Sequence, residues 1–297
     1  MRLIKKAVIT TGVLAASYIA YETISEEIFK TTFLPRKISY IVKAEEKEWL
    51  NNSNALQVNI NSLDGYKLCA YNIHNHDNHK YIIMLHGLWA DKSSNYYRAI
   101  HFDKLGYNLL LVDQRGSGQS EGNYITYGQK ESLDLVQWID YLITKDPEVE
   151  ICLYGVSMGA VTVMMSLAND ISKNVKCIVE DSGFSSFKDE LEHYIETKYN
   201  IPFSSVVTSL IETKMKENLG ITYDDVVPKN CLDENEIPIL FIHCKNDSLV
   251  PFEMSKVLYN HNKGLKKYYP IEDADHCEGI SDANYFINVN NFISQFM

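Results

Sequence analysis

The chain has 297 residues, of which 45% are hydrophobic and 23% are charged. This composition is typical of a folded globular protein and excludes a disordered one. The formal net charge of −11 would repel a phosphate backbone, so we expect no nucleic acid partner.

The amino-terminal segment differs from the rest of the chain in charge and hydropathy. Residues 1–43 carry seven basic and three acidic side chains, which suits an anionic membrane surface. Arg2, Lys5 and Lys6 precede an apolar run from Ala7 to Tyr21. Basic residues before a short apolar run are typical of an export signal or a signal anchor.

Three readings of this segment are open. Residues 15–17 form a small-residue cleavage site, but the apolar residues 18–20 follow directly, which favours an uncleaved anchor. We therefore predict a signal anchor or membrane-associated helix over residues 1–30. The remaining domain, residues 31–297, is then expected outside the cytoplasm. The alternatives are a cleaved signal and an ordinary amphipathic helix that packs on the body.

The first strands after this segment are predicted as a hairpin. Strand-like runs cover residues 56–61 and 66–73, and Asp64-Gly65 lies between them. An Asp-Gly pair between alternating apolar runs is a strong hairpin signal.

From residue 80 onward, continuous apolar runs alternate with helical periodicity. Continuous runs suit parallel strands that are covered by helices on both faces. We expect such strands at 81–85, 108–112, 151–154, 177–179 and 239–242. The predicted fold class is α/β, a doubly wound and mostly parallel sheet with an antiparallel hairpin at its start.

One segment breaks the alternation of strands and helices. Residues 181–237 have helical character and no clear strand. A sheet crossover is usually shorter, so we predict a helical cap at about 184–236 over the carboxyl edge of the sheet.

The cysteines and clustered histidines are interpreted as structural. The six cysteines include no Cys-x-x-Cys pair, so zinc and thioredoxin-like sites lack support. A disulfide from Cys231 to another loop cysteine stays open. His74, His76 and His79 crowd one loop, and we interpret them as a polar surface loop rather than as a metal site.

The strongest chemical signal is Gly155-Val156-Ser157-Met158-Gly159. It follows the predicted strand 151–154 and opens the helix that begins near Met158. In such a strand-to-helix turn, small flanking residues allow tight backbone approach and the serine hydroxyl is raised above the sheet edge. Ser157 is therefore the predicted nucleophile.

A serine hydroxyl needs a base to remove its proton. His276 lies in a predicted loop after the last strand, late in the chain, as the order Ser, Asp, His requires. Asp247 follows the strand 239–242 and is predicted to orient His276, with Asp181 as the rival carboxylate.

Acyl transfer also needs hydrogen-bond donors for the oxyanion. The strand 81–85 ends in His86-Gly87-Leu88-Trp89. The backbone amides of Leu88 and Met158 are predicted to form a two-donor oxyanion hole. His86 is then an organiser of the loop and not a base.

These motifs resemble the α/β-hydrolase superfamily, in the branch of serine aminopeptidase-like and monoacylglycerol-lipase-like enzymes. The resemblance rests on the sequences 86–87, 113–120, 155–159, 247–251 and His276, which stand in the family's order. It implies a triad of Ser157, Asp247 and His276 without metal or organic cofactor. It also implies that the 113–120 loop braces the site.

The predicted function is cleavage of a carboxylic ester through an acyl-enzyme. An anchor beside a helical cap favours lipid-derived or other amphiphilic esters. The first alternative is an amide or peptide hydrolase of the aminopeptidase type, in which the acidic cap attracts a free ammonium. The second is a membrane-tethered binding protein that keeps the fold without turnover.

Overall fold

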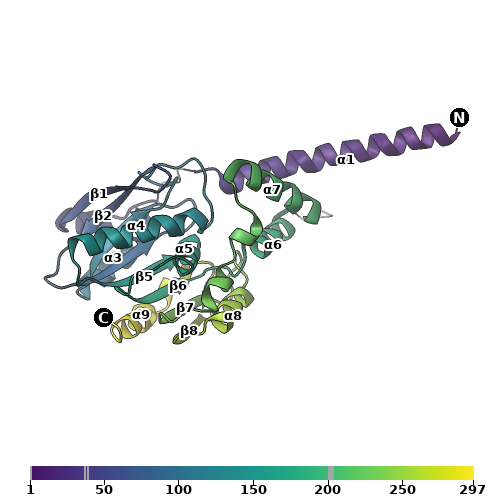
Figure 1. The fold of residues 1–297 in the computed structure, drawn as a ribbon. Coiled ribbons are helices and arrows are strands. Elements are labelled where there is room, and N and C mark those ends of the chain that lie inside the picture. The colour runs from purple at the N-terminus through teal and green to yellow at the C-terminus, as the bar shows by residue number, and fades with distance from the viewer. Residues whose placement is uncertain (1, 37, 39, 200–203) are drawn as a thin grey trace.

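The computed structural model describes residues 2–36, 38, 40–199 and 204–297, with side chains from Tyr18 onward except that of residue 204. One eight-stranded sheet forms its centre, in the order β1-β2-β4-β3-β5-β6-β7-β8 (Figure 1). The strands are β1 Ala55–Asn61, β2 Lys67–Ile73, β3 Lys80–Leu85, β4 Asn108–Asp113, β5 Glu150–Val156, β6 Val175–Asp181, β7 Ile239–Cys244 and β8 Lys266–Ile271.

The directions of the strands confirm the predicted fold class. β2 is antiparallel to both β1 and β4, and every pairing from β4 through β8 is parallel. The hairpin that was expected around Asp64-Gly65 is the β1–β2 pair. Since the carboxyl ends of the parallel strands share one sheet edge, loops from distant parts of the sequence meet there.

Helices cover both faces of the sheet. Side chains of α3 and α9 pack on one face, and those of α4, α5 and α8 pack on the other. The helices are α1 Arg2–Phe33, α2 Ala44–Asn52, α3 Tyr96–Lys104, α4 Gln129–Lys145, α5 Met158–Ser166, α6 Phe187–Tyr199, α7 Ser204–Leu219, α8 Phe252–His261 and α9 Tyr285–Ile293.

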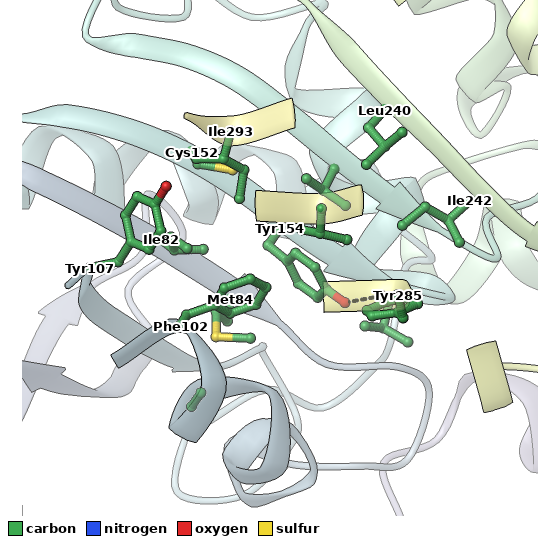
Figure 2. Packing of buried hydrophobic residues seen from close by; sticks show 14 of the residues in the cluster. Ile82, Met84, Phe102, Tyr107, Cys152, Tyr154, Leu240, Ile242, Tyr285 and Ile293 are labelled. Atoms are coloured by element: carbon green, nitrogen blue, oxygen red, sulfur yellow. Dashed lines mark hydrogen bonds between the residues drawn. The ribbon is translucent and has the colours of Figure 1, made fainter. Parts of the chain in front are cut away.

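The core beneath α3 and α9 is dense and aromatic. Figure 2 shows Phe102 and Tyr285 reaching the strand residue Tyr154, whose hydroxyl is hydrogen-bonded to that of Tyr285. All three side chains are buried. This contact attaches the carboxyl-terminal helix to β5, the strand that leads to Ser157.

The segment between β6 and β7 is helical, and it packs with α1. It contains α6 and α7, and Figure 1 shows α1 passing beside α7 and projecting away from the body. Ile28, Phe29 and Phe33 of α1 are buried in the same apolar cluster as residues of α6 and α7. Lys214 of α7 forms ion pairs with Glu22 and Glu26 of α1. The last turns of α1 are therefore part of the folded body.

The side chains of residues 1–17, on which the anchor prediction mainly rests, lie outside the described residues. Within the portion that the structure describes, no helix combines the length and the apolarity needed to cross a membrane.

Removing the Trp138 side chain should destabilise the fold strongly. Trp138 of α4 is fully buried against the sheet, and truncating such a side chain typically costs about 3–5 kcal/mol. We expect Trp138→Ala to lower the free energy of unfolding by this amount in chemical denaturation. Asp140→Ala, at an exposed position of the same helix, should change it by less than about 0.5 kcal/mol. Equal effects of the two substitutions would contradict the described packing.

Candidate active site

The turn between β5 and α5 holds Ser157 in an unusual backbone conformation. Its φ of 54° and ψ of −117° are strained for a residue with a side chain. A Cβ atom at Gly155 would lie 2.3 Å from the Gly159 carbonyl oxygen, and one at Gly159 would lie 2.4 Å from the Leu85 carbonyl oxygen. Positions 155 and 159 must both be glycine because β3, β5 and α5 approach each other too closely to admit a Cβ atom there.

Three side chains that were singled out from the sequence form one hydrogen-bonded line. The Ser157 Oγ lies 2.9 Å from His276 Nε2, and His276 Nδ1 lies 2.7 Å from Asp247 Oδ2. In the tautomer that fits these contacts, Nδ1–H donates to the carboxylate and Nε2 accepts from the serine hydroxyl. The arrangement can remove the hydroxyl proton and stabilise the resulting imidazolium.

Loops at the carboxyl edge of the sheet present Asp247 and His276. Asp247 follows β7, and its Oδ1 accepts the backbone N–H groups of Leu249 and Val250 at 3.0 and 2.8 Å. His276 follows β8, and its backbone N–H donates to Asp275 at 2.7 Å. Asp275 also accepts from the Ser248 backbone N–H at 2.8 Å. The two loops are thereby tied to each other.

A second imidazole, that of His243, also contacts Asp247. His243 Nε2 lies 3.3 Å from Asp247 Oδ2 and 3.0 Å from the Val250 carbonyl oxygen. Burial alone would raise the pKa of Asp247, but hydrogen bonds from His243 and His276 outweigh burial and hold that pKa well below its usual range. Asp247 therefore stays ionised between the two rings.

The contact of His243 with Asp247 is not among the features predicted from the sequence. The signal that could have revealed it is its place at the end of β7, four residues before Asp247.

The rival carboxylate, Asp181, has other partners. Its Oδ2 accepts the Tyr285 hydroxyl at 2.5 Å and lies 3.8 Å from Arg98. Its carbonyl oxygen accepts the Ser157 backbone N–H at 2.7 Å. Asp181 thus fixes the backbone beneath Ser157 and does not contact His276.

The loop after β3 approaches the serine closely. A Cβ atom at Gly87 would lie 3.3 Å from the Ser157 Cβ. His86 is fully buried, its Nδ1 lies 2.8 Å from the Gly87 carbonyl oxygen, and its Nε2 accepts the Gln114 backbone N–H at 3.1 Å. Burial lowers the pKa of His86, so its ring stays neutral and organises the loop.

The two predicted oxyanion residues lie beside the serine. Leu88 and Met158 line the same cavity as Ser157. Met158 is the first residue of α5, so its backbone N–H has no partner within the helix, a position that suits the binding of an anion.

Buried ion pairs brace the loop of residues 113–120. Asp113 accepts the Lys92 ammonium at 2.5 Å and the Gln119 backbone N–H at 2.9 Å. Arg115 donates to Asp134 at 2.7 Å and to Asp64 at 2.8 Å. These contacts connect the β1–β2 turn with α4.

A cavity of about 270 Å³ opens above Ser157. Most of its wall is apolar or aromatic, and it comes from the β5–α5 turn, from α6 and from the loop after β7. Two threonines from the last turn of α1 also line it. The lining residues are Thr31, Thr32, Leu88, Trp89, Tyr127, Ser157, Met158, Phe184, Phe187, Glu190, Leu191, Tyr194, Lys198, Leu249 and Val250.

The described residues contain no cluster of three or more side chains that could hold a metal ion. His76 contacts Asp103 at 2.9 Å and His79 contacts Asp146 at 2.6 Å. All six cysteines carry free thiols, including Cys231.

Comparison with known proteins agrees with this architecture. Residues 85–216 match the family model of the X-Pro dipeptidyl-peptidases of the S15 family. The uncharacterised protein YqkD of Bacillus subtilis is 30% identical over 218 residues, which cover 73% of this chain and 71% of YqkD. The lysophosphatidylserine lipase ABHD12 of Danio rerio is 26% identical, over 61% of this chain and 47% of its own length.

A solved structure extends the likeness to nearly the whole chain. The Pyrococcus furiosus esterase Pf2001 superposes with a TM-score of 0.71 at 24% identity, covering 89% of this chain and 98% of the esterase. With the strand order and the turn at Ser157, these matches identify the chain as a hydrolase of the family that contains YqkD, within the α/β-hydrolase superfamily.

Proposed function

We propose that this protein is a serine hydrolase that cleaves a carboxylic ester through an acyl-enzyme, with Ser157 as nucleophile, His276 as base and Asp247 as orienting acid. The observation that supports it best is the line of contacts from Ser157 Oγ through His276 to Asp247, at 2.9 and 2.7 Å.

Each half-reaction moves one proton through His276. Ser157 Oγ attacks the carbonyl carbon while its proton passes to Nε2, and the tetrahedral intermediate collapses as Nε2–H protonates the departing alcohol. Water then attacks the acyl-enzyme, gives its proton to Nε2, and Ser157 leaves with that proton. The backbone amides of Leu88 and Met158 hold the oxyanion in both halves.

The shape and lining of the cavity favour an acyl group as occupant. Its wall is mainly apolar, and burial of hydrocarbon there supplies binding free energy. The name of the relative ABHD12 denotes a lipase, and that of the structural neighbour Pf2001 an esterase. Both support an ester, including one derived from a lipid.

A peptide substrate is the second candidate because of one finding, the match of residues 85–216 to a dipeptidyl-peptidase family model. Comparing kcat/KM for a short p-nitrophenyl ester with that for an aminoacyl p-nitroanilide separates the two. A higher kcat/KM for the anilide would mean that the substrate is an amide and not an ester.

We also propose that the predicted segment of residues 1–30 attaches the protein to a membrane through its amino-terminal part, with the catalytic domain outside the cytoplasm. The basic residues before the apolar run support this orientation. The projection of α1 from the body (Figure 1) leaves its amino-terminal part available for such contact.

A fluorophosphonate probe should label the wild-type protein on Ser157. The activated hydroxyl attacks phosphorus as it would a carbonyl carbon, so Ser157→Ala should abolish labelling seen by gel fluorescence and mass spectrometry. A folded wild type that stays unlabelled would favour the alternative of a binding protein without turnover.

Asp247→Asn should lower kcat by about 10⁴-fold, because an amide cannot hold His276 in the reactive tautomer or stabilise its charged form. Asp273→Asn removes a carboxylate from the loop after β8, which also carries His276, at an exposed position and should leave kcat within about twofold. Comparable losses in the two variants would remove Asp247 from the proposed triad.

Deleting residues 2–17 should release the protein from membranes in a sedimentation assay while hydrolysis continues. Among the described side chains of α1, the first buried one is Ser25, so the deletion ends before the part of α1 that is seen to pack on the body. Unchanged sedimentation of the truncated protein would refute attachment through this segment.

A further inference from the structure

Glu190 is a buried acid in the substrate cavity that the proposed reaction does not use. It lies in the first turn of α6 and lines the same cavity as Ser157. Its exposed fraction is 8%, and its Oε2 atom has no hydrogen-bond partner within the part of the chain that the structure describes. A buried polar atom without a partner is uncommon, and it indicates a group that a ligand completes.

The surroundings of Glu190 favour its neutral form. Burial, and then the negative charge of Asp247, raise the pKa of Glu190 to about 8, against the opposing effect of His243. At neutral pH the carboxyl therefore mostly keeps its proton. A neutral carboxyl donates one hydrogen bond through its hydroxyl and accepts another through its carbonyl oxygen.

Among the described residues, no protein group forms a hydrogen bond with the Oε2 atom of Glu190. Phe187 and Leu191, next to Glu190 on α6, are apolar. The cation in the cavity wall, Lys198, is eight residues further along α6, about 12 Å along the helix axis. The Lys198 ammonium is hydrogen-bonded to the Tyr194 hydroxyl and lies over the rings of Tyr194 and Tyr199.

We propose that Glu190 is a specificity residue that hydrogen-bonds a free hydroxyl carried by the substrate near its scissile ester, an inference that rests on the proposed ester hydrolysis. A hydroxyl both donates and accepts, so it matches a protonated carboxyl. An anionic group would need a cation in place of Glu190. An ammonium would require Glu190 to ionise beside Asp247.

The test compares three butyrate esters, hydrolysed by the full-length protein in a pH-stat at pH 7. Glycerol monobutyrate carries free hydroxyls, propyl butyrate is its apolar counterpart, and butyrylcholine carries a cation. The wild type should have a higher kcat/KM for glycerol monobutyrate than for the other two esters. Glu190→Met should lower that value about tenfold and leave propyl butyrate within about twofold, since the neutral hydrogen bonds between the carboxyl and the substrate hydroxyl are lost.

Two further variants distinguish hydrogen bonding from charge. Glu190→Gln keeps a donor and an acceptor and should retain the preference for glycerol monobutyrate within about threefold. Asp189→Asn removes an exposed charge from the neighbouring position of α6 and should change none of the three rates. Thermal denaturation of each variant verifies that it is folded.

Three results would overturn the assignment of Glu190. Equal losses on all esters in a folded Glu190→Met protein would make the residue structural. A preference for butyrylcholine that Glu190→Gln abolishes would mean that a cation is recognised. If Ser157 is labelled and the wild type hydrolyses all three esters at equal rates, the hydroxyl preference is refuted but the proposed function stands. If both labelling and hydrolysis fail, the proposed function itself is refuted.

Discussion

The conformation of one residue, Ser157, constrains the rest of the site. Its φ of 54° and ψ of −117° are tolerated only because the surroundings fix them. The Ser157 N–H donates to the Asp181 carbonyl oxygen. The backbone around positions 155 and 159 leaves no room for a side chain, so both are glycine. This conformation places the hydroxyl at the amino terminus of α5 and at the carboxyl edge of the sheet, beside the loops that carry Asp247 and His276.

The second constraint is a carboxylate between two imidazoles. Asp247 is held by two backbone amides and contacted by both His243 and His276. These donors oppose the effect of burial and keep the acid ionised. In the proposed mechanism, this fixed negative charge favours the imidazolium that would form during proton transfer. The position of His276 is thus set by β7 and β8 together rather than by its own loop alone.

The sequence was most informative where local backbone geometry or burial requires a particular type of residue. The Gly-x-Ser-x-Gly turn, the apolar strands and the Asp-Gly hairpin each depend on neighbouring residues, and they predicted the sheet and the place of Ser157. Asp247 and His276 were then selected because they follow predicted strands in the order that the expected topology requires. The bounds of β8 could not be predicted from the sequence. This strand lies at the edge of the sheet, where its residues are only partly buried, and it therefore has no continuous apolar run.

Contacts between distant segments could not be predicted in this way. The contact of His243 with Asp247 depends on how one loop bends back over β7. The entry of Thr31 and Thr32 into the cavity depends on the packing of α1 against α7. The burial of Glu190 needs the cap to be folded over Ser157. None of these contacts follows from a local sequence pattern, because each one joins segments that are far apart in the chain.

A crystal structure of the fluorophosphonate adduct would test the central claim most directly. The account predicts a covalent bond from Ser157 Oγ to phosphorus, with one phosphoryl oxygen about 2.7–3.1 Å from the amides of Leu88 and Met158 and with His276 Nε2 facing the leaving-group side. An adduct on another residue, or a phosphoryl oxygen that points away from both amides, would contradict it.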